Sequence, residues 1–187
     1  MGGSASTRLS VDDWTERALA LLMSEGVAAI KVNRLCRDLG VTKGSFYWHF
    51  ADVDALMSAL AERWCAETRS ALVGLEELHH LPALERIRAM ALRLVDDHSW
   101  SVERALRDWA RTDARVAAVI AQTDEFIFEL VQAALLELGY DATGARLRAG
   151  LLVYAGIGFA HGQAALAKPT PDDIDDLMDL IAGDVAR

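Results

Sequence analysis

The stretch from Leu35 to Phe50, LCRDLGVTKGSFYWHF, contains two short apolar repeats separated by a glycine. Leu35 and Leu39 are four residues apart, so both side chains can lie on one face of a helix. Gly40 follows directly and can adopt the positive φ angle that ends a helix in a tight turn. This half of the stretch predicts a short helix that ends in a turn.

The second half predicts another short helix with two different faces. Thr42 is a good N-cap, because its side-chain oxygen can accept a hydrogen bond from a free amide of the first turn. Phe46 and Phe50 repeat the four-residue apolar spacing and are assigned to the core. The outer face would carry Lys43, Ser45, Tyr47, Trp48 and His49. A two-turn helix with such a face is typical of insertion into a DNA groove.

The run GVTKGSFYWHF, followed by Asp52, Asp54, Ala55 and Leu56, resembles the DNA-binding signature of TetR/AcrR-type transcriptional regulators. The resemblance covers roughly the first 65 residues closely and extends beyond them only as an all-helical layout. It implies an N-terminal helix-turn-helix domain, a C-terminal ligand-binding and dimerisation domain, and repression that a small molecule relieves.

The whole chain is expected to be all-α, with about nine helices. Three prolines in 187 residues and a high content of alanine and leucine favour helices throughout. We expect a three-helix helix-turn-helix DNA-binding domain over residues 1–52. A helical ligand-binding and dimerisation domain would occupy residues 53–187.

Capping residues and apolar spacing predict the helix bounds. Ser10 would cap a first helix that ends at Glu25, and Asn33 would cap a second one. Asp52 would cap a fourth helix that links the two domains. The remaining helices are predicted at about Pro82–His98, Val102–Thr112, Ala114–Leu138, Ala142–Ala167 and Pro171–Val185.

Candidate DNA contacts lie on the second helix of the motif. A lysine can donate to guanine and an indole can contact a thymine methyl, so Lys43 and Trp48 are candidates for base contacts. The resemblance places Thr42, Tyr47 and His49 at positions that usually touch phosphate. A glycine allows close backbone approach, and a serine can contact either a base or a phosphate. The predicted DNA-binding set is Thr42, Lys43, Gly44, Ser45, Tyr47, Trp48 and His49. Packing of the aromatic residues against the first helix is the alternative.

The charge distribution is unusual for a DNA-binding protein. The net charge is -9, although residues 1–64 carry seven Lys/Arg and eight Asp/Glu. Related regulators usually carry a Lys or Arg three residues after the final Phe of the motif, where this chain has Val53 between two aspartates. Arg34 and Arg37 are candidates to compensate, or they form solvated surface. DNA binding would therefore depend on few donors and be sensitive to salt.

The resemblance implies an effector cavity in the C-terminal domain. Apolar residues with a few polar groups are typical of ligand pockets. The candidate pocket residues are Met90, Leu94, Trp100, Trp109, Phe126, Leu130, Tyr154 and His161, with Asp97, His98 and Arg107 as candidate polar groups. Ordinary core packing is the alternative for each of them. A lipophilic effector fits this set, but its identity is open.

The last two predicted helices are candidates for a dimer interface. An apolar helix rich in small residues beside an amphipathic helix suits close packing against a second subunit. The predicted interface residues are Leu147, Leu151, Gly158, Gly162, Ile174, Leu177, Met178 and Ile181. The alternative is that both helices cover the core of a monomer.

Other classes of protein find little support. No catalytic motif, metal-ligand spacing or glycine-rich phosphate loop is present, so we expect no enzyme activity, metal or cofactor. Cys36 and Cys65 form no motif and indicate free thiols in a reducing compartment. No apolar run is long enough for a membrane span and no signal core is seen at the start, which predicts a cytoplasmic protein.

The sequence therefore predicts a homodimeric one-component regulator, with repression as the favoured mode, that binds a pseudo-palindromic operator and is released by a small effector. The alternative is a dimeric small-molecule-binding or interaction protein whose DNA binding has weakened. The operator, the regulated genes and the choice between repression and activation are left open by the sequence.

Overall fold

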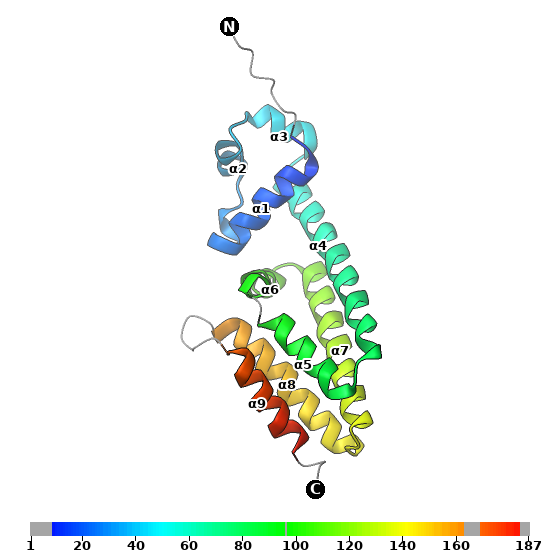
Figure 1. Cartoon of the computed structure of the whole chain (residues 1–187). Helices are drawn as coiled ribbons and strands as arrows, with labels where there is room; N and C mark the ends of the chain where they lie inside the picture. The colour runs from blue at the N-terminus through cyan, green and yellow to red at the C-terminus, as the bar shows by residue number, and fades with distance from the viewer. Residues whose placement is uncertain (1–8, 96, 163–168, 184–187) are drawn as a thin grey trace. The chain divides into compact units, whose positions relative to one another are not determined.

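The computed structural model describes residues 9–95, 97–162 and 169–183, and α-helices dominate these segments (Figure 1). The chain divides into two compact units, residues 1–66 and 67–187, which are called the head and the body below. In the described residues the helices are α1 (Val11–Glu25), α2 (Val32–Asp38), α3 (Lys43–His49), α4 (Val53–Glu76), α5 (Ala83–Leu94), α6 (Asp97–Ala110), α7 (Ala114–Glu137), α8 (Ala142–Gly162) and α9 (Pro171–Ala182). Two short 3-10 turns, η1 (Val27–Ala29) and η2 (Glu77–His80), connect α1 to α2 and α4 to α5.

The head is built on the apolar side of α1. Trp14 and Leu21 are almost fully buried there, because residues spaced by three or four share one helical face. Leu35 from α2, Phe46 from α3 and Leu56 from α4 close this core. Burial of a large apolar side chain is worth about 1.5–3 kcal/mol. These residues therefore stabilise the short helices α2 and α3, which would be unstable alone.

The body is a layered helical unit. Helix α7 packs against α5, α6 and α8, and α9 packs against α5 (Figure 1). Its main core contains Ala83, Ile87, Val131, Ala134, Leu135, Ala145, Ala149, Met178 and Ile181. The alanines of α7 and α8 allow these two helices to approach closely, which suits the apolar character of α8.

Most predicted helix ends agree with the structure. Ser10 and Asp13 form a capping box at the start of α1, and Thr170 forms another with Asp173 at the start of α9. The main-chain amide of Ala55 donates to the Asp52 side chain at 2.8 Å, as expected for a cap of α4.

Three predicted boundaries were wrong. Helix α2 begins at Val32 after Lys31, so Asn33 lies inside its first turn and is not the cap. Helix α5 ends at Leu94 rather than at about His98, and α6 begins at Asp97 rather than at about Val102. The apolar spacing continues across this break, so periodicity alone could not locate it. The predicted C-terminal ends of α8 and α9, residues 163–168 and 184–187, lie outside the described residues.

Membrane insertion finds no support in the described segments. None of their helices combines the length and the apolar character that a bilayer crossing requires.

Candidate nucleic-acid interface

The turn between α2 and α3 is fixed by local backbone chemistry. Gly40 has φ 67°, a left-handed conformation that side chains with a Cβ rarely adopt. The amide of Val41 then donates to the carbonyl of Cys36 at 2.9 Å, which closes the turn. Thr42 accepts from the amide of Ser45 at 3.4 Å and caps α3, as predicted from the sequence.

One side of α3 anchors the helix in the head. Phe46 is fully buried and meets Trp14 edge to face, with ring centroids 5.3 Å apart. Phe50 is 6% exposed and its ring centroid lies 5.6 Å from that of Phe46. Aromatic contacts of this kind add about 0.5–1.5 kcal/mol beyond the area they bury. The assignment of both phenylalanines to the core is therefore confirmed.

The other side of α3 is open to solvent. Tyr47 is 57% exposed and Trp48 is 64% exposed, so neither packs into the head core. Lys43 is also exposed at the N-terminal end of the helix. Large aromatic residues are costly to leave in water, and two neighbours on one exposed face mark a contact surface.

The remaining members of the predicted set differ in position. His49 is half-buried, with its ring centroid 4.6 Å from Trp48 and 6.3 Å from Trp14. Ser45 is half-buried, while Gly44 is exposed. A Cβ on Gly44 would meet only the Thr42 hydroxyl, at 3.5 Å, so the surface beside this glycine is open.

A cluster of ion pairs joins α1 to α2 in the head. Arg17 donates through Nε to Asp38 at 3.0 Å, and Arg34 donates through Nε to the same carboxylate at 3.0 Å. Arg34 also makes a two-point contact with Glu25, with Nη2 2.6 Å from Oε1 and Nη1 3.1 Å from Oε2. The neighbouring Arg17 guanidinium holds the pKa of Asp38 below its usual range, with Arg34 contributing as well.

These contacts divide the cations of the head into two groups. Arg17 and Arg34 are held by carboxylates, and Arg63 lies 3.5 Å from Glu16. Lys31, Arg37 and Lys43 are exposed and form no ion pair within the described residues. Arg34 was a candidate to compensate for the missing cation at Val53, but its guanidinium is already paired with carboxylates. Val53 itself is half-buried at the start of α4.

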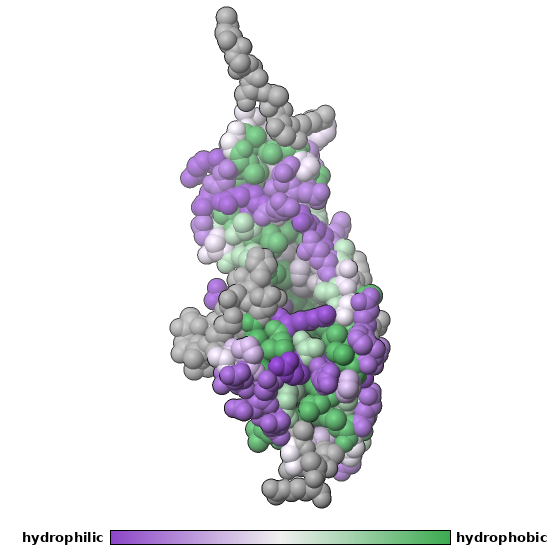
Figure 2. All heavy atoms as spheres, viewed as in Figure 1, coloured by the Kyte–Doolittle hydropathy of each residue, from purple (hydrophilic) through white to green (hydrophobic). Residues whose placement is uncertain are grey.

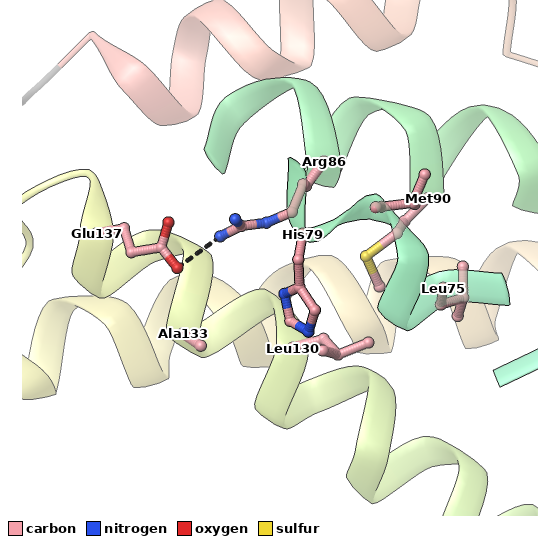
Figure 3. A pocket seen from close by; sticks show the side chains of 8 residues that line it. Leu75, His79, Arg86, Met90, Leu130, Ala133 and Glu137 are labelled. Carbon is pink, nitrogen blue, oxygen red and sulfur yellow. Dashed lines mark ion pairs between the residues drawn. The ribbon is translucent and has the colours of Figure 1, made fainter. Parts of the chain in front are cut away.

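The body contains a small cavity of about 30 Å³ between the C-terminal end of α4, η2, α5 and α7. Its lining residues are Leu75, Leu78, His79, Arg86, Met90, Leu130, Ala133 and Glu137. Figure 3 shows Arg86 and Glu137 reaching toward each other along one side, with Nη2 2.7 Å from Oε1. A volume of this size admits about one water molecule.

Only part of the predicted pocket set lines this cavity. Met90 and Leu130 do, whereas Trp109 is 2% exposed elsewhere in the body and Tyr154 is 74% exposed. Leu94 and Phe126 are half-buried, and His161 is exposed. The side chains of Trp100, Asp97 and His98 lie outside those that the structure describes. The lining residues from η2 were missed because no motif in the sequence marks a short 3-10 turn.

Arg107, the other candidate polar group of the pocket, is engaged in a local network. Its guanidinium lies 2.7 Å from Glu103 and 2.6 Å from Asp124, and its side chain is only 14% exposed. These ion pairs raise the pKa of Arg107 against the opposing effect of desolvation, which is the largest single contribution. Arg107 therefore ties α6 to α7.

Helix α8 carries an exposed apolar surface. Leu147 is 53% exposed, Leu151 is 72% exposed and Tyr154 is 74% exposed, and these residues recur at helical spacing. Gly158 continues the exposed surface and Gly162 is half-buried. Figure 2 shows green hydrophobic residues at the surface of the body between purple hydrophilic ones. The side chains of Leu147, Leu151 and Tyr154 will be called the α8 apolar surface.

The predicted interface residues of α9 lie differently. Ile174, Met178 and Ile181 are buried in the monomer, and Leu177 is half-buried against the same core. These side chains therefore cover the body's own core rather than an open surface, which was the alternative for this helix. Leu180, 76% exposed, is the large apolar residue that α9 turns to solvent.

Metal binding finds no site in the part of the chain that the structure describes, where no group of three or more His, Cys, Asp or Glu side chains converges.

The head has the geometry of a helix-turn-helix domain: two short helices joined by a glycine turn, packed on a longer first helix. Its residues 15–60 match the family model described as "Bacterial regulatory proteins, tetR family". The class E tetracycline repressor protein of Escherichia coli is 39% identical over 66 residues, 34% of this chain and 31% of that protein. A class A tetracycline repressor from transposon 1721 is 38% identical over 64 residues. The matched segment spans about a third of these curated relatives.

Solved structures extend the likeness to the fold of the whole chain. A transcriptional regulator from Rhodococcus sp. Rha1 aligns with TM-score 0.69 and 20% identity over 95% of this chain and 96% of its own. A regulator from Saccharomonospora viridis, solved in complex with choline, aligns with TM-score 0.71 and 16% identity over 92% and 95%. At this identity the alignments describe the fold, which is all-α with a helix-turn-helix head and a helical C-terminal unit.

The head thus has the fold and the sequence signature of the helix-turn-helix domains found in transcriptional regulators. More narrowly, the predicted resemblance to TetR/AcrR-type regulators is confirmed by the family match, the tetracycline repressors and the shared fold.

Proposed function

We propose that this chain is a one-component transcriptional regulator that binds a pseudo-palindromic operator as a homodimer and acts as a repressor. The observation that carries the proposal is the division of α3 into two sides. Phe46 fixes the helix in the head, while Tyr47 and Trp48 are more than half exposed beside an exposed Lys43. Such a helix is held rigidly and presents groups that can donate to DNA.

The exposed side chains have separate roles in this proposal. Lys43 donates to guanine O6 or N7 in the major groove, and the Trp48 indole packs against a thymine methyl or a sugar. Tyr47 and the capping Thr42 donate to phosphates, which positions the helix. His49 is fixed between two indole rings and donates to a phosphate from the edge of the surface.

Dimerisation uses the α8 apolar surface. Leu147, Leu151 and Tyr154 lie on one helix, and a two-fold axis would bring two copies of the same surface together. Burial of this surface removes large apolar groups from water in both copies at once. A symmetric pair of heads then reads two half-sites about 34–36 Å apart along the duplex.

The effector would enter the body beside the small cavity. The present volume of about 30 Å³ is too small for an organic ligand, so a lipophilic effector requires the lining side chains to separate. Met90 suits this role because an unbranched thioether repacks easily. Helix α4 contributes Leu56 to the head core and Leu75 to the cavity, and a displacement of α4 is the proposed link between ligand and DNA.

A gel-shift experiment with the DNA upstream of this protein's own gene tests the proposal. Wild-type protein should bind at low salt, and Lys43→Ala should weaken specific binding by about 5–150-fold, the equivalent of 1–3 kcal/mol. Arg146→Ala is the matched control, since it removes an exposed cation from the body. Absence of binding by the wild type at low salt would contradict the proposal.

A second candidate is a dimeric small-molecule-binding or interaction protein with weakened DNA binding. The observation behind it is the start of α4, where Val53 replaces a cation and the flanking Asp52 and Asp54 are exposed. A salt titration separates the two candidates, because a DNA-binding protein loses affinity steeply as salt rises.

A further inference from the structure

The ion-pair cluster of the head has a feature that helix packing alone does not require. It consists of two cations, Arg17 and Arg34, and two carboxylates, Glu25 and Asp38, so its net charge is zero. Asp38 is shared by both arginines and its side chain is 15% exposed, whereas the arginine side chains are 33% and 32% exposed. The side-chain atoms of Asp38 are thus less accessible than those of the two arginines that they contact, although Asp38 as a whole residue is exposed.

Half of the cluster, Arg34 and Asp38, lies on the helix that is expected to approach the DNA backbone. In helix-turn-helix proteins the first helix of the motif crosses the phosphate backbone. Here that helix is α2, whose inner residues Leu35 and Cys36 are buried. Arg34, Arg37 and Asp38 occupy its remaining surface. Of these, Arg37 forms no ion pair within the described residues, while Arg34 makes contacts with two carboxylates.

We propose that Asp38 is a positioning residue that withholds Arg17 and Arg34 from DNA phosphates and thereby limits the sequence-independent part of DNA affinity. The inference rests on the proposed DNA-binding function and adds a residue that sets the balance between specific and non-specific binding. Phosphate contacts attract any duplex equally, whereas base contacts distinguish sequences. A head that withholds two cations therefore relies more on α3 for its affinity.

Asp38 contacts both arginines, whereas Glu25 contacts Arg34. The Oδ2 atom of Asp38 accepts from Arg17 Nε and from Arg34 Nε, each at 3.0 Å. Charge-assisted contacts of this kind are short and directional, and they fix both guanidinium planes. Arg34 keeps its contact with Glu25 if Asp38 is neutralised, but Arg17 has no other carboxylate partner in the described residues. Arg17 is thus the cation that neutralisation of Asp38 releases.

The test measures the salt dependence of binding to a labelled duplex of arbitrary sequence, by fluorescence anisotropy of the full chain. Counting described residues only, Lys31, Arg37 and Lys43 of two heads can neutralise six phosphates, which gives a log–log slope of about -5 for the wild type. Asp38→Asn should steepen this slope by about 2 and raise low-salt affinity by about tenfold. Glu62→Gln, an exposed carboxylate of α4 in the same unit, is the matched change of charge and should have a smaller effect.

A double variant separates released charge from altered packing. Adding Arg17→Gln to Asp38→Asn should return the slope close to that of the wild type, because the released cation is gone. A folded Asp38→Asn protein whose slope equals that of the wild type, or a double variant that keeps the steeper slope, would overturn the inference.

Two single variants keep the inference testable should Asp38→Asn fail to fold. Arg17→Gln as a single change should leave the log–log salt slope equal to that of the wild type. Arg37→Gln as a single change should make that slope shallower by about 2. Equal effects of the two changes would overturn the inference while the DNA-binding proposal stands. Absence of salt-dependent duplex binding by every one of these proteins would overturn the proposed function, and the inference with it.

Discussion

Helices α3 and α8 both expose large side chains, but the chemistry of the two surfaces differs. On α3 the exposed groups Tyr47 and Trp48 each carry a hydrogen-bond donor and lie near a lysine. On α8 the exposed leucines Leu147 and Leu151 carry none, and the Tyr154 hydroxyl is the one donor of the α8 apolar surface as defined above. A surface with donors and a positive charge suits a polyanion, while an aliphatic surface suits another apolar surface. Exposure is thus common to both surfaces, and the polar groups on each indicate the kind of partner that it suits.

The first prediction concerns the buried side of α3, where the largest effect is expected. Phe46→Ala should reduce the free energy of unfolding by about 3–5 kcal/mol, since it leaves a cavity against Trp14 in a small core. Urea unfolding followed by tryptophan fluorescence measures the loss. Tyr47→Ala on the exposed side is the control and should change stability by less than about 0.5 kcal/mol. Similar losses for both variants would show that α3 does not have two distinct sides.

The second prediction concerns the α8 apolar surface. Leu151→Asp places two like charges across the proposed two-fold axis and should weaken the dimer by about 100-fold or more. Sedimentation velocity over a range of concentrations measures the dissociation. Val73→Asp introduces the same charge at an exposed position of α4 and should leave the dimer intact. An unchanged dimer in Leu151→Asp would show that this part of α8 does not form the dimer interface.

The third prediction contrasts one aromatic residue from each surface. Trp48→Ala should weaken binding to the operator by about 5–150-fold and leave the dimer unchanged, because its indole belongs to the proposed DNA surface of α3 and not to the α8 apolar surface. Tyr154→Ala should have the opposite pattern, with a weaker dimer and DNA binding that recovers at high protein concentration. Anisotropy and sedimentation on the same samples give both values. Loss of dimerisation in Trp48→Ala would show that the two surfaces do not have separate roles.

The smallest effect is expected from pH. The hydrogen bond from Arg17 lowers the folded-state pKa of Asp38 below its ordinary range. The stabilisation is therefore present above the unfolded pKa and is lost as pH falls through the folded pKa. The thermal midpoint of the wild type should fall more steeply than that of Asp38→Asn between about pH 5 and about pH 3. Parallel curves would indicate that the ion pair does not stabilise the head.

Sequence patterns predicted the head better than the body because its decisive signals are local. The φ angle of Gly40, the cap at Thr42 and the spacing of the phenylalanines all act within one turn of helix. The contact between Arg17 and Asp38 joins residues 21 positions apart and has no local signal. This contact depends on the packing of α1 against α2, which no local pattern in the sequence describes.

In the body, composition indicated apolar helices but not which face of each is open. Helix α8 carries apolar residues on every side, so its periodicity alone does not show that Ala145 and Ala149 are buried while Leu151 is exposed. Helix α9 has a clear apolar face, yet that face is used within the monomer by Ile174 and Met178. The cavity depends on η2 and on the ion pair between Arg86 and Glu137, which are products of tertiary packing.

The most direct test of the central claim is selection of duplexes from a random pool by the wild-type protein at moderate salt. A dimer with two α3 helices should enrich an inverted repeat whose half-site centres are about 10–10.5 base pairs, or a small multiple of this, apart. The Lys43→Ala protein should enrich that repeat less strongly. Enrichment of no sequence, or of a single half-site without symmetry, would contradict the account of a dimeric, sequence-reading regulator.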